Sequence, residues 1–90
     1  MSVPTLFVPP VLDGDQGLVL RINGVAPEPC GRRWYVLTMD GVAYGLPQAL
    51  WPWAMELDAQ TRRRERRMPA AFAFRRVGRT LFAEPVIACL

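Results

Sequence analysis

The sequence of 90 residues contains no histidine and no lysine, and its only serine is Ser2. Histidine, lysine and serine supply many of the general bases and nucleophiles of enzymes, alongside carboxylates, tyrosine and cysteine. The eight acidic residues are scattered, and no nucleophile lies in a pattern that pairs it with a base. The glycines form no phosphate-binding loop motif. We therefore expect a protein that is not an enzyme and has no catalytic residues.

Cysteine is also scarce, with only Cys30 and Cys89. Two thiolates without histidine do not complete a tetrahedral zinc site, and two cysteines in these positions do not resemble a secretory disulfide framework. No segment approaches the roughly 20 apolar residues of a membrane helix, and the N-terminus lacks a basic region followed by an apolar run. We expect a cytoplasmic protein that holds no metal or other cofactor and has no membrane partner.

All 11 basic residues are arginines, and eight of them lie within residues 62–79, where Glu65 is the only acid. That segment carries a charge of +7, whereas the rest of the chain carries −4. A basic segment in an otherwise acidic chain indicates contact with a polyanion. Arginine suits such contact, because it binds phosphate in a bidentate manner and stacks on bases. For residues 62–67 the alternatives are a protein partner, contact with a long strand, or a helix end that is only solvated, which we favour.

The first half of the chain has the pattern of short strands. In residues 18–25, Leu18, Leu20 and Ile22 alternate with more polar positions, which predicts a strand with one apolar face. Residues 33–39 and 42–46 flank Asp-Gly, which predicts a hairpin with a type I′ turn. Residues 5–8 are expected to pair only at a sheet edge, because two prolines follow, and 13–17 to form a turn.

The second half predicts one helix and a second hairpin. A short turn at Pro47 is expected to lead into a helix over about residues 52–66, in which Asp58 and Arg62 are spaced i, i+4. Residues 70–77 and 80–88 then flank Gly-Arg and predict two further strands.

The order of strand, strand, strand, helix, strand, strand is that of an OB barrel. We therefore expect one mainly β domain over residues 1–90. It comprises a small five-stranded OB-like barrel at 18–88, with one helix between strands three and four. Residues 1–17, which are rich in proline and glycine, form an N-terminal edge segment.

Arginines and aromatic residues are interleaved on the predicted strands, as single-strand binders require for phosphates and bases. Successive side chains of a strand face opposite sides, so Trp34 and Tyr35 cannot both lie in the core. We take Trp34 as the outward ring, while the alternative is that Trp34, Phe72 and Phe74 are all core. The predicted stacking residues are Trp34 and Tyr44, and the predicted phosphate contacts are Arg33, Arg75, Arg76 and Arg79.

Trp51 and Trp53 flank Pro52 at the start of the predicted helix. We expect them to pack in the core or to cover one end of the barrel. An exposed tryptophan pair would instead mark a surface for a protein partner.

Two segments, residues 35–44 and residues 75–80 running into 84–86, resemble small OB-fold single-stranded DNA-binding proteins of phages and plasmids. The resemblance covers roughly residues 18–87 and is one of pattern, without a diagnostic motif. It implies a strand-binding surface on the barrel face and a role in replication, recombination or maintenance of a mobile element. The chain departs from this group in lacking lysine and in having a short loop where longer basic arms often occur.

These observations predict a protein that binds single-stranded nucleic acid, DNA in preference to RNA. The main alternative is a small phage- or plasmid-encoded interaction module or inhibitor that binds a partner protein through its basic helix and tryptophan pair. A third hypothesis is a homodimer built through the proline-containing edge at residues 4–10.

Overall fold

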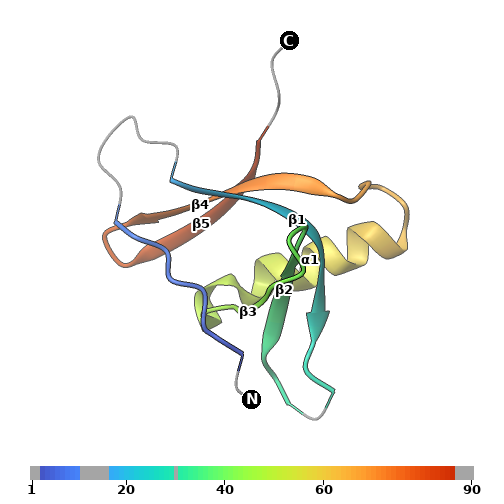
Figure 1. Cartoon of the computed structure of the whole chain (residues 1–90), viewed down its shortest axis with the longest axis horizontal. Coiled ribbons are helices and arrows are strands. Elements are labelled where there is room, and N and C mark those ends of the chain that lie inside the picture. The colour runs from blue at the N-terminus through green and yellow to red at the C-terminus, as the bar shows by residue number, and fades with distance from the viewer. Residues whose placement is uncertain (1–2, 11–16, 30, 87–90) are drawn as a thin grey trace.

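In the part of the chain that the structure describes, five antiparallel strands form one sheet, and one α-helix packs against one of its faces (Figure 1). The computed structural model describes residues 3–10, 17–29 and 31–86. In chain order the elements are β1 (Leu18–Pro27), β2 (Trp34–Thr38), β3 (Ala43–Gly45), a 3-10 turn η1 (Gln48–Leu50), α1 (Trp51–Arg62), β4 (Ala70–Val77) and β5 (Thr80–Pro85).

The strand order in the sheet is β3-β2-β1-β4-β5, with the long strand β1 at the centre. The first half of β1 pairs with β4, and the second half pairs with β2. The register shifts between Ile22 and Gly24, and such an irregularity bends a strand. The mainly β class with one helix after the third strand is thus confirmed. Within the described residues β3 and β5 do not pair with each other, so the sheet is open, and the predicted closure into a barrel is not observed.

The core lies between one face of the sheet and α1. Ile22 of β1 and Phe72 and Phe74 of β4 are buried on this face, so the alternative that placed the two phenylalanines in the core is confirmed. The indole ring of Trp53 on α1 meets Phe72 and Phe74 edge to face, with ring centroids 5.4 and 5.3 Å away. Leu57, one helical turn further along α1, is also buried. The helix therefore presents one apolar stripe to the sheet.

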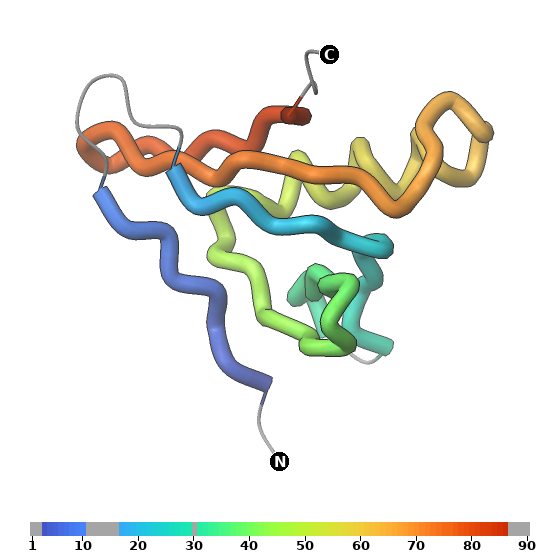
Figure 2. Tube along the Cα trace, turned by 45° about the horizontal axis from the view of Figure 1, so that its top comes forward, coloured from blue at the N-terminus to red at the C-terminus, as the bar shows by residue number. Residues whose placement is uncertain are grey.

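The N-terminal segment, residues 3–10, runs alongside the sheet from the β3 edge to the end of β4 (Figure 2). Its pairing is limited to two isolated parallel bridges, Thr5 with Gly45 and Pro10 with Arg76. Leu6 and Val8 are nevertheless buried in the core. The predicted edge pairing of residues 5–8 is confirmed, whereas residues 11–16, which contain most of the predicted turn at 13–17, lie outside the described part.

Both predicted hairpins are present, but the first has a different turn. Gly41 has a φ of +83°, while Asp40 is absent from the non-glycine residues with positive φ. A type I′ turn requires positive φ at both central residues, so that turn assignment was wrong. The Gly41 N–H donates to the Thr38 carbonyl at 3.1 Å, which closes a slightly longer loop. In the second hairpin Val77 pairs with Thr80 around Gly78, whose φ is +61°.

The helix ends at Arg62, four residues before the predicted end. Arg64 adopts a left-handed φ of +61°. The Glu65 N–H donates to the Gln60 carbonyl at 2.8 Å, and the Arg64 N–H donates to the Thr61 carbonyl at 3.1 Å. These two bonds form a Schellman motif with Arg64 at the position that glycine usually occupies. Because residue 64 is an arginine and not a glycine, the sequence does not indicate that the helix ends at this point.

Candidate nucleic-acid interface

A pocket of about 430 Å³ opens where the β1–β2 loop, β3 and the N-terminal segment meet. Its chemistry is mixed, since it combines one aromatic ring with one side chain of each charge. The lining residues are Val3, Thr5, Glu28, Arg33, Tyr35, Gly45 and Leu46.

Tyr35 supplies the ring of this pocket because it faces away from the core. Val36 and Thr38 are buried on the inner side of β2, and Trp34 shares that side and packs against the core. The Tyr35 ring lies across Gly45, where a Cβ would be 3.7 Å from its Cε1 atom. The alternation argument was therefore right in placing one ring outward, but it chose Trp34 where the structure has Tyr35.

Tyr44, the second predicted stacking residue, also faces inward. It pairs with Val36 across the hairpin and is partly buried against the core. Side chains directly opposite each other in an antiparallel pair share a face. Tyr44 is thus a core residue in this structure, and its ring is not part of the pocket.

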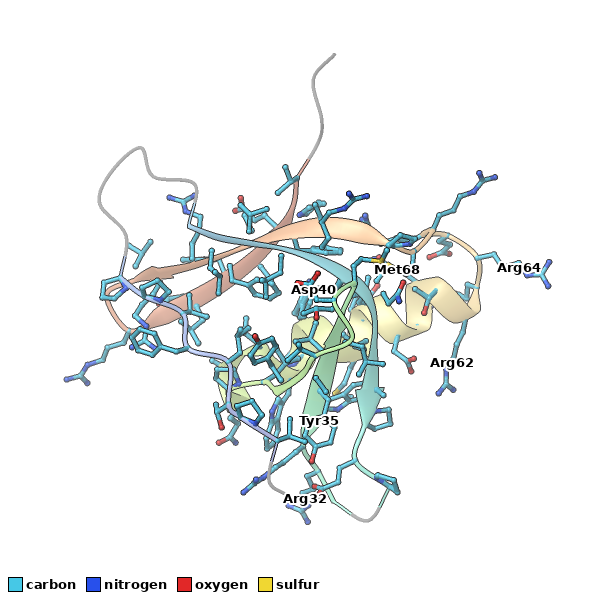
Figure 3. All side chains as sticks on the ribbon, in the orientation of Figure 1. Arg32, Tyr35, Asp40, Arg62, Arg64 and Met68 are labelled. Carbon is cyan, nitrogen blue, oxygen red and sulfur yellow. The ribbon has the colours of Figure 1, made fainter. Side chains whose placement is uncertain are left out.

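Arg33 is exposed at the end of the β1–β2 loop. The Glu28 N–H donates to the Arg33 carbonyl at 2.8 Å, which closes the loop and brings both residues to the pocket. Figure 3 shows Arg32 and Tyr35 at the same end of the domain, with Arg62 and Arg64 on another side. In the part of the chain that the structure describes, no carboxylate pairs with Arg33.

Phe7 and Arg76 form a second pairing of ring and cation at the opposite end of the N-terminal segment. The Phe7 side chain is 68% exposed, and the Arg76 guanidinium carbon lies 5.8 Å from its ring centroid. The Arg76 Nε atom is buried and has no hydrogen-bond partner among the described residues. The arrangement is a cation–π contact whose ring remains open to a second stacking partner.

The remaining predicted phosphate contacts lie on the β4–β5 hairpin. Arg75 is directly opposite Phe82 in the register, so both face the outer side of the sheet, and Phe82 is 43% exposed. Arg79 is exposed in the turn. Of the six predicted site residues, the structure thus places Arg33 at the pocket and Arg75, Arg76 and Arg79 at this hairpin.

The exposed face of the N-terminal segment connects these two places. Val3 and Thr5 line the pocket, Phe7 follows on the same side, and Pro10 pairs with Arg76. We call the set along this line, the exposed Arg33 and Phe7 and the half-buried Tyr35 and Arg76, the arginine–aromatic track. Phe7 and Tyr35 were missed as site residues. For Phe7 a signal was available, since Leu6 and Val8 alternate with it in a predicted edge strand.

Three of the five arginines at residues 62–67 contact side chains on or near the helix end. Arg62 pairs with Asp58 at 3.1 Å, and Arg63 pairs with Glu65 at 3.1 Å. Arg66 donates from Nε to Gln60 at 3.1 Å, and its guanidinium lies 5.5 Å from the Phe72 ring centroid. These contacts favour the interpretation of this run as a solvated helix end whose contacts stabilise the fold.

Both helix tryptophans pack in the domain, as predicted. The Trp51 indole N–H donates to the Leu46 carbonyl at 3.0 Å, and Trp53 contacts the two buried phenylalanines described above. An exposed tryptophan pair for a protein partner is therefore not present.

Among the described residues no three His, Cys, Asp or Glu side chains gather in a way that could hold a metal ion. No helix in the described ranges has the length and apolarity needed to cross a membrane. No family model, curated protein or solved structure gives a significant match to the chain.

Proposed function

We propose that this chain binds single-stranded nucleic acid, DNA in preference to RNA, along the arginine–aromatic track. The observation that carries the proposal is that an arginine and an aromatic ring occur together at two places along one segment. Arg33 and Tyr35 line the same pocket, and the Arg76 guanidinium lies over the Phe7 ring. Flat rings stack on bases of any sequence, and guanidinium groups neutralise the phosphates between them.

The topology supports an OB-like arrangement. One helix follows the third strand, and the central first strand pairs with both the second and the fourth. We propose that the N-terminal segment completes the barrel between β3 and the end of β4. In OB folds the face of strands two and three, together with the loops after strands one and four, binds oligonucleotides. In the proposed barrel the pocket and the β4–β5 turn would correspond to these binding elements.

The length of the track suits a short strand. Residues 3–10 are extended and span at most about 25 Å, because an extended chain advances about 3.3–3.6 Å per residue. OB folds bind roughly 4–16 nucleotides, and a track of this length fits the low end of that range.

The hydrophobic core anchors the N-terminal segment on which part of the track lies. Leu6 and Val8 are 5% and 0% exposed, so the backbone that presents Phe7 is anchored in the core. The Leu6 N–H donates to the Gly45 carbonyl at 2.8 Å, which fixes the same segment beside the pocket. Binding therefore requires little ordering of the segment, and this reduces the entropic cost of association.

The alternative of a protein partner has less support. Its distinguishing feature was an exposed tryptophan pair beside the basic helix, and Trp51 and Trp53 pack against the core. The basic helix end also makes its own ion pairs, with Asp58 and Glu65.

The proposal is tested by titrating a fluorescein-labelled oligo-dT of about 12 nucleotides and following its anisotropy at several salt concentrations. Binding should weaken linearly on log–log axes, with a slope of about −0.7 for each phosphate neutralised on a single strand. Arg33→Ala should reduce both the affinity and the slope. Arg67→Ala, an exposed arginine outside the track, is the matched control. An unchanged anisotropy at low salt, or equal losses for the two variants, would refute the proposal.

A further inference from the structure

The pocket contains a carboxylate that strand binding alone does not explain. Glu28 lines it together with Arg33 and Tyr35, and within the described chain its carboxylate makes no ion pair and no side-chain hydrogen bond. A negative charge in a site for a polyanion repels phosphate. Glu28 therefore favours binding only if the ligand brings a hydrogen-bond donor to it.

The local backbone holds this carboxylate in place. Glu28 is half-buried, its N–H donates to the Arg33 carbonyl, and its carboxylate lies directly against Gly31. A Cβ at residue 31 would overlap Glu28 Oε2, so the absence of a side chain there makes room for the carboxylate. The loop thus positions an acceptor near the Tyr35 ring.

The nucleobases differ in the donors that they offer to a carboxylate. An ionised carboxylate is an acceptor with two oxygens and binds best to two parallel donors. Guanine carries two adjacent donors on its Watson–Crick edge, N1–H and N2–H. Adenine and cytosine present a single amino group there, and thymine a single N–H.

We infer that the pocket binds a guanine base of the bound strand. Tyr35 stacks on the base, the Glu28 carboxylate accepts from N1–H and N2–H, and Arg33 pairs with a neighbouring phosphate. A pocket of about 430 Å³ is within the size range of small-molecule sites. This inference rests on the proposed strand binding and adds a base preference at one position of the track.

The test compares three labelled oligonucleotides that differ at one central position, which is thymine, guanine or hypoxanthine in an otherwise oligo-dT strand. Hypoxanthine lacks only the N2 amino group of guanine. Guanine should bind about tenfold more tightly than thymine, within the range of a bidentate contact to a base edge, and hypoxanthine should lose most of that gain.

Two variants complete the design. Glu28→Gln should remove the preference for guanine over thymine, because a neutral amide no longer offers two equivalent acceptor oxygens. Glu84→Gln, which removes an exposed carboxylate on β5, should leave the preference intact. Equal binding of guanine and hypoxanthine, or a preference that survives Glu28→Gln, overturns the base assignment alone. Absence of binding to all three strands overturns the proposed function as well.

Discussion

The Arg76 guanidinium lies over the Phe7 ring, 5.8 Å from its centroid, although the two residues come from opposite ends of the chain. Because Phe7 is 68% exposed, the contact leaves the other side of the ring open. The pair therefore contributes little to stability, about 0.5–1 kcal/mol at an exposed site.

Phe7→Ala should weaken binding of oligo-dT by about 5- to 150-fold, corresponding to the roughly 1–3 kcal/mol of one stacked base. The free energy of unfolding should fall by less than about 1 kcal/mol. Anisotropy titration and urea denaturation measure the two effects. Met55→Ala, an exposed apolar residue on α1, is the control and should leave binding unchanged. A large loss of stability with unchanged binding would show that Phe7 is structural.

Trp34→Ala should mainly lower stability, whereas Tyr35→Ala should mainly lower binding. Trp34 packs against the core, so its truncation should lower the free energy of unfolding by about 2–4 kcal/mol. Tyr35 lines the pocket, so its truncation should lower binding by about 1–3 kcal/mol with little loss of stability. Urea denaturation measures the stability of both variants, and anisotropy titration measures their binding. If Trp34→Ala were stable and defective in binding, the assignment of the outward ring would be reversed.

Arg64→Gly should stabilise the protein by about 0.4–1 kcal/mol, because glycine adopts the observed φ of +61° without steric cost. For a domain of this size that corresponds to an increase in Tm of several degrees. Arg67→Gly removes the same charge at a residue without positive φ and should not stabilise. Thermal unfolding followed by circular dichroism compares the two, and equal Tm values would contradict the helix-end assignment.

Trp53→Ala should lower the free energy of unfolding by about 3 kcal/mol, since its ring contacts both Phe72 and Phe74. Asp58→Asn, in contrast, should cost no more than about 0.5 kcal/mol. Its ion pair with Arg62 is an i, i+4 pair in which the arginine side chain is 74% exposed. Urea denaturation should rank the two variants in this order. A larger loss for Asp58→Asn would indicate that surface charge, not aromatic packing, holds the helix.

Local patterns predicted most of the fold. Alternation identified β1, and Gly78 marked the second hairpin. Phe72 and Phe74 are buried, as the alternative interpretation held. Two details were not predicted because no local sequence pattern indicates them. The helix stops at Arg62 through a left-handed arginine, and the first turn uses positive φ only at Gly41.

The site was harder to predict, because it depends on which face of a strand meets the core. Alternation predicts that Trp34 and Tyr35 face opposite sides of the strand, but it does not say which of them faces the core. In the structure Val36 and Thr38 are buried, and Trp34 lies on the same side of the strand as these two residues. The Phe7–Arg76 contact could not be foreseen, since it requires the N-terminal segment to cross the sheet to the end of β4.

The most direct measurement is a set of amide ¹H–¹⁵N spectra of the uniformly labelled protein, recorded while oligo-dT is added. The account predicts that the largest shifts fall on residues 3–10, on the β1–β2 loop up to Tyr35, and on the end of β4 around Arg76. Shifts confined to α1 and residues 62–67, or spectra that do not change, would contradict it.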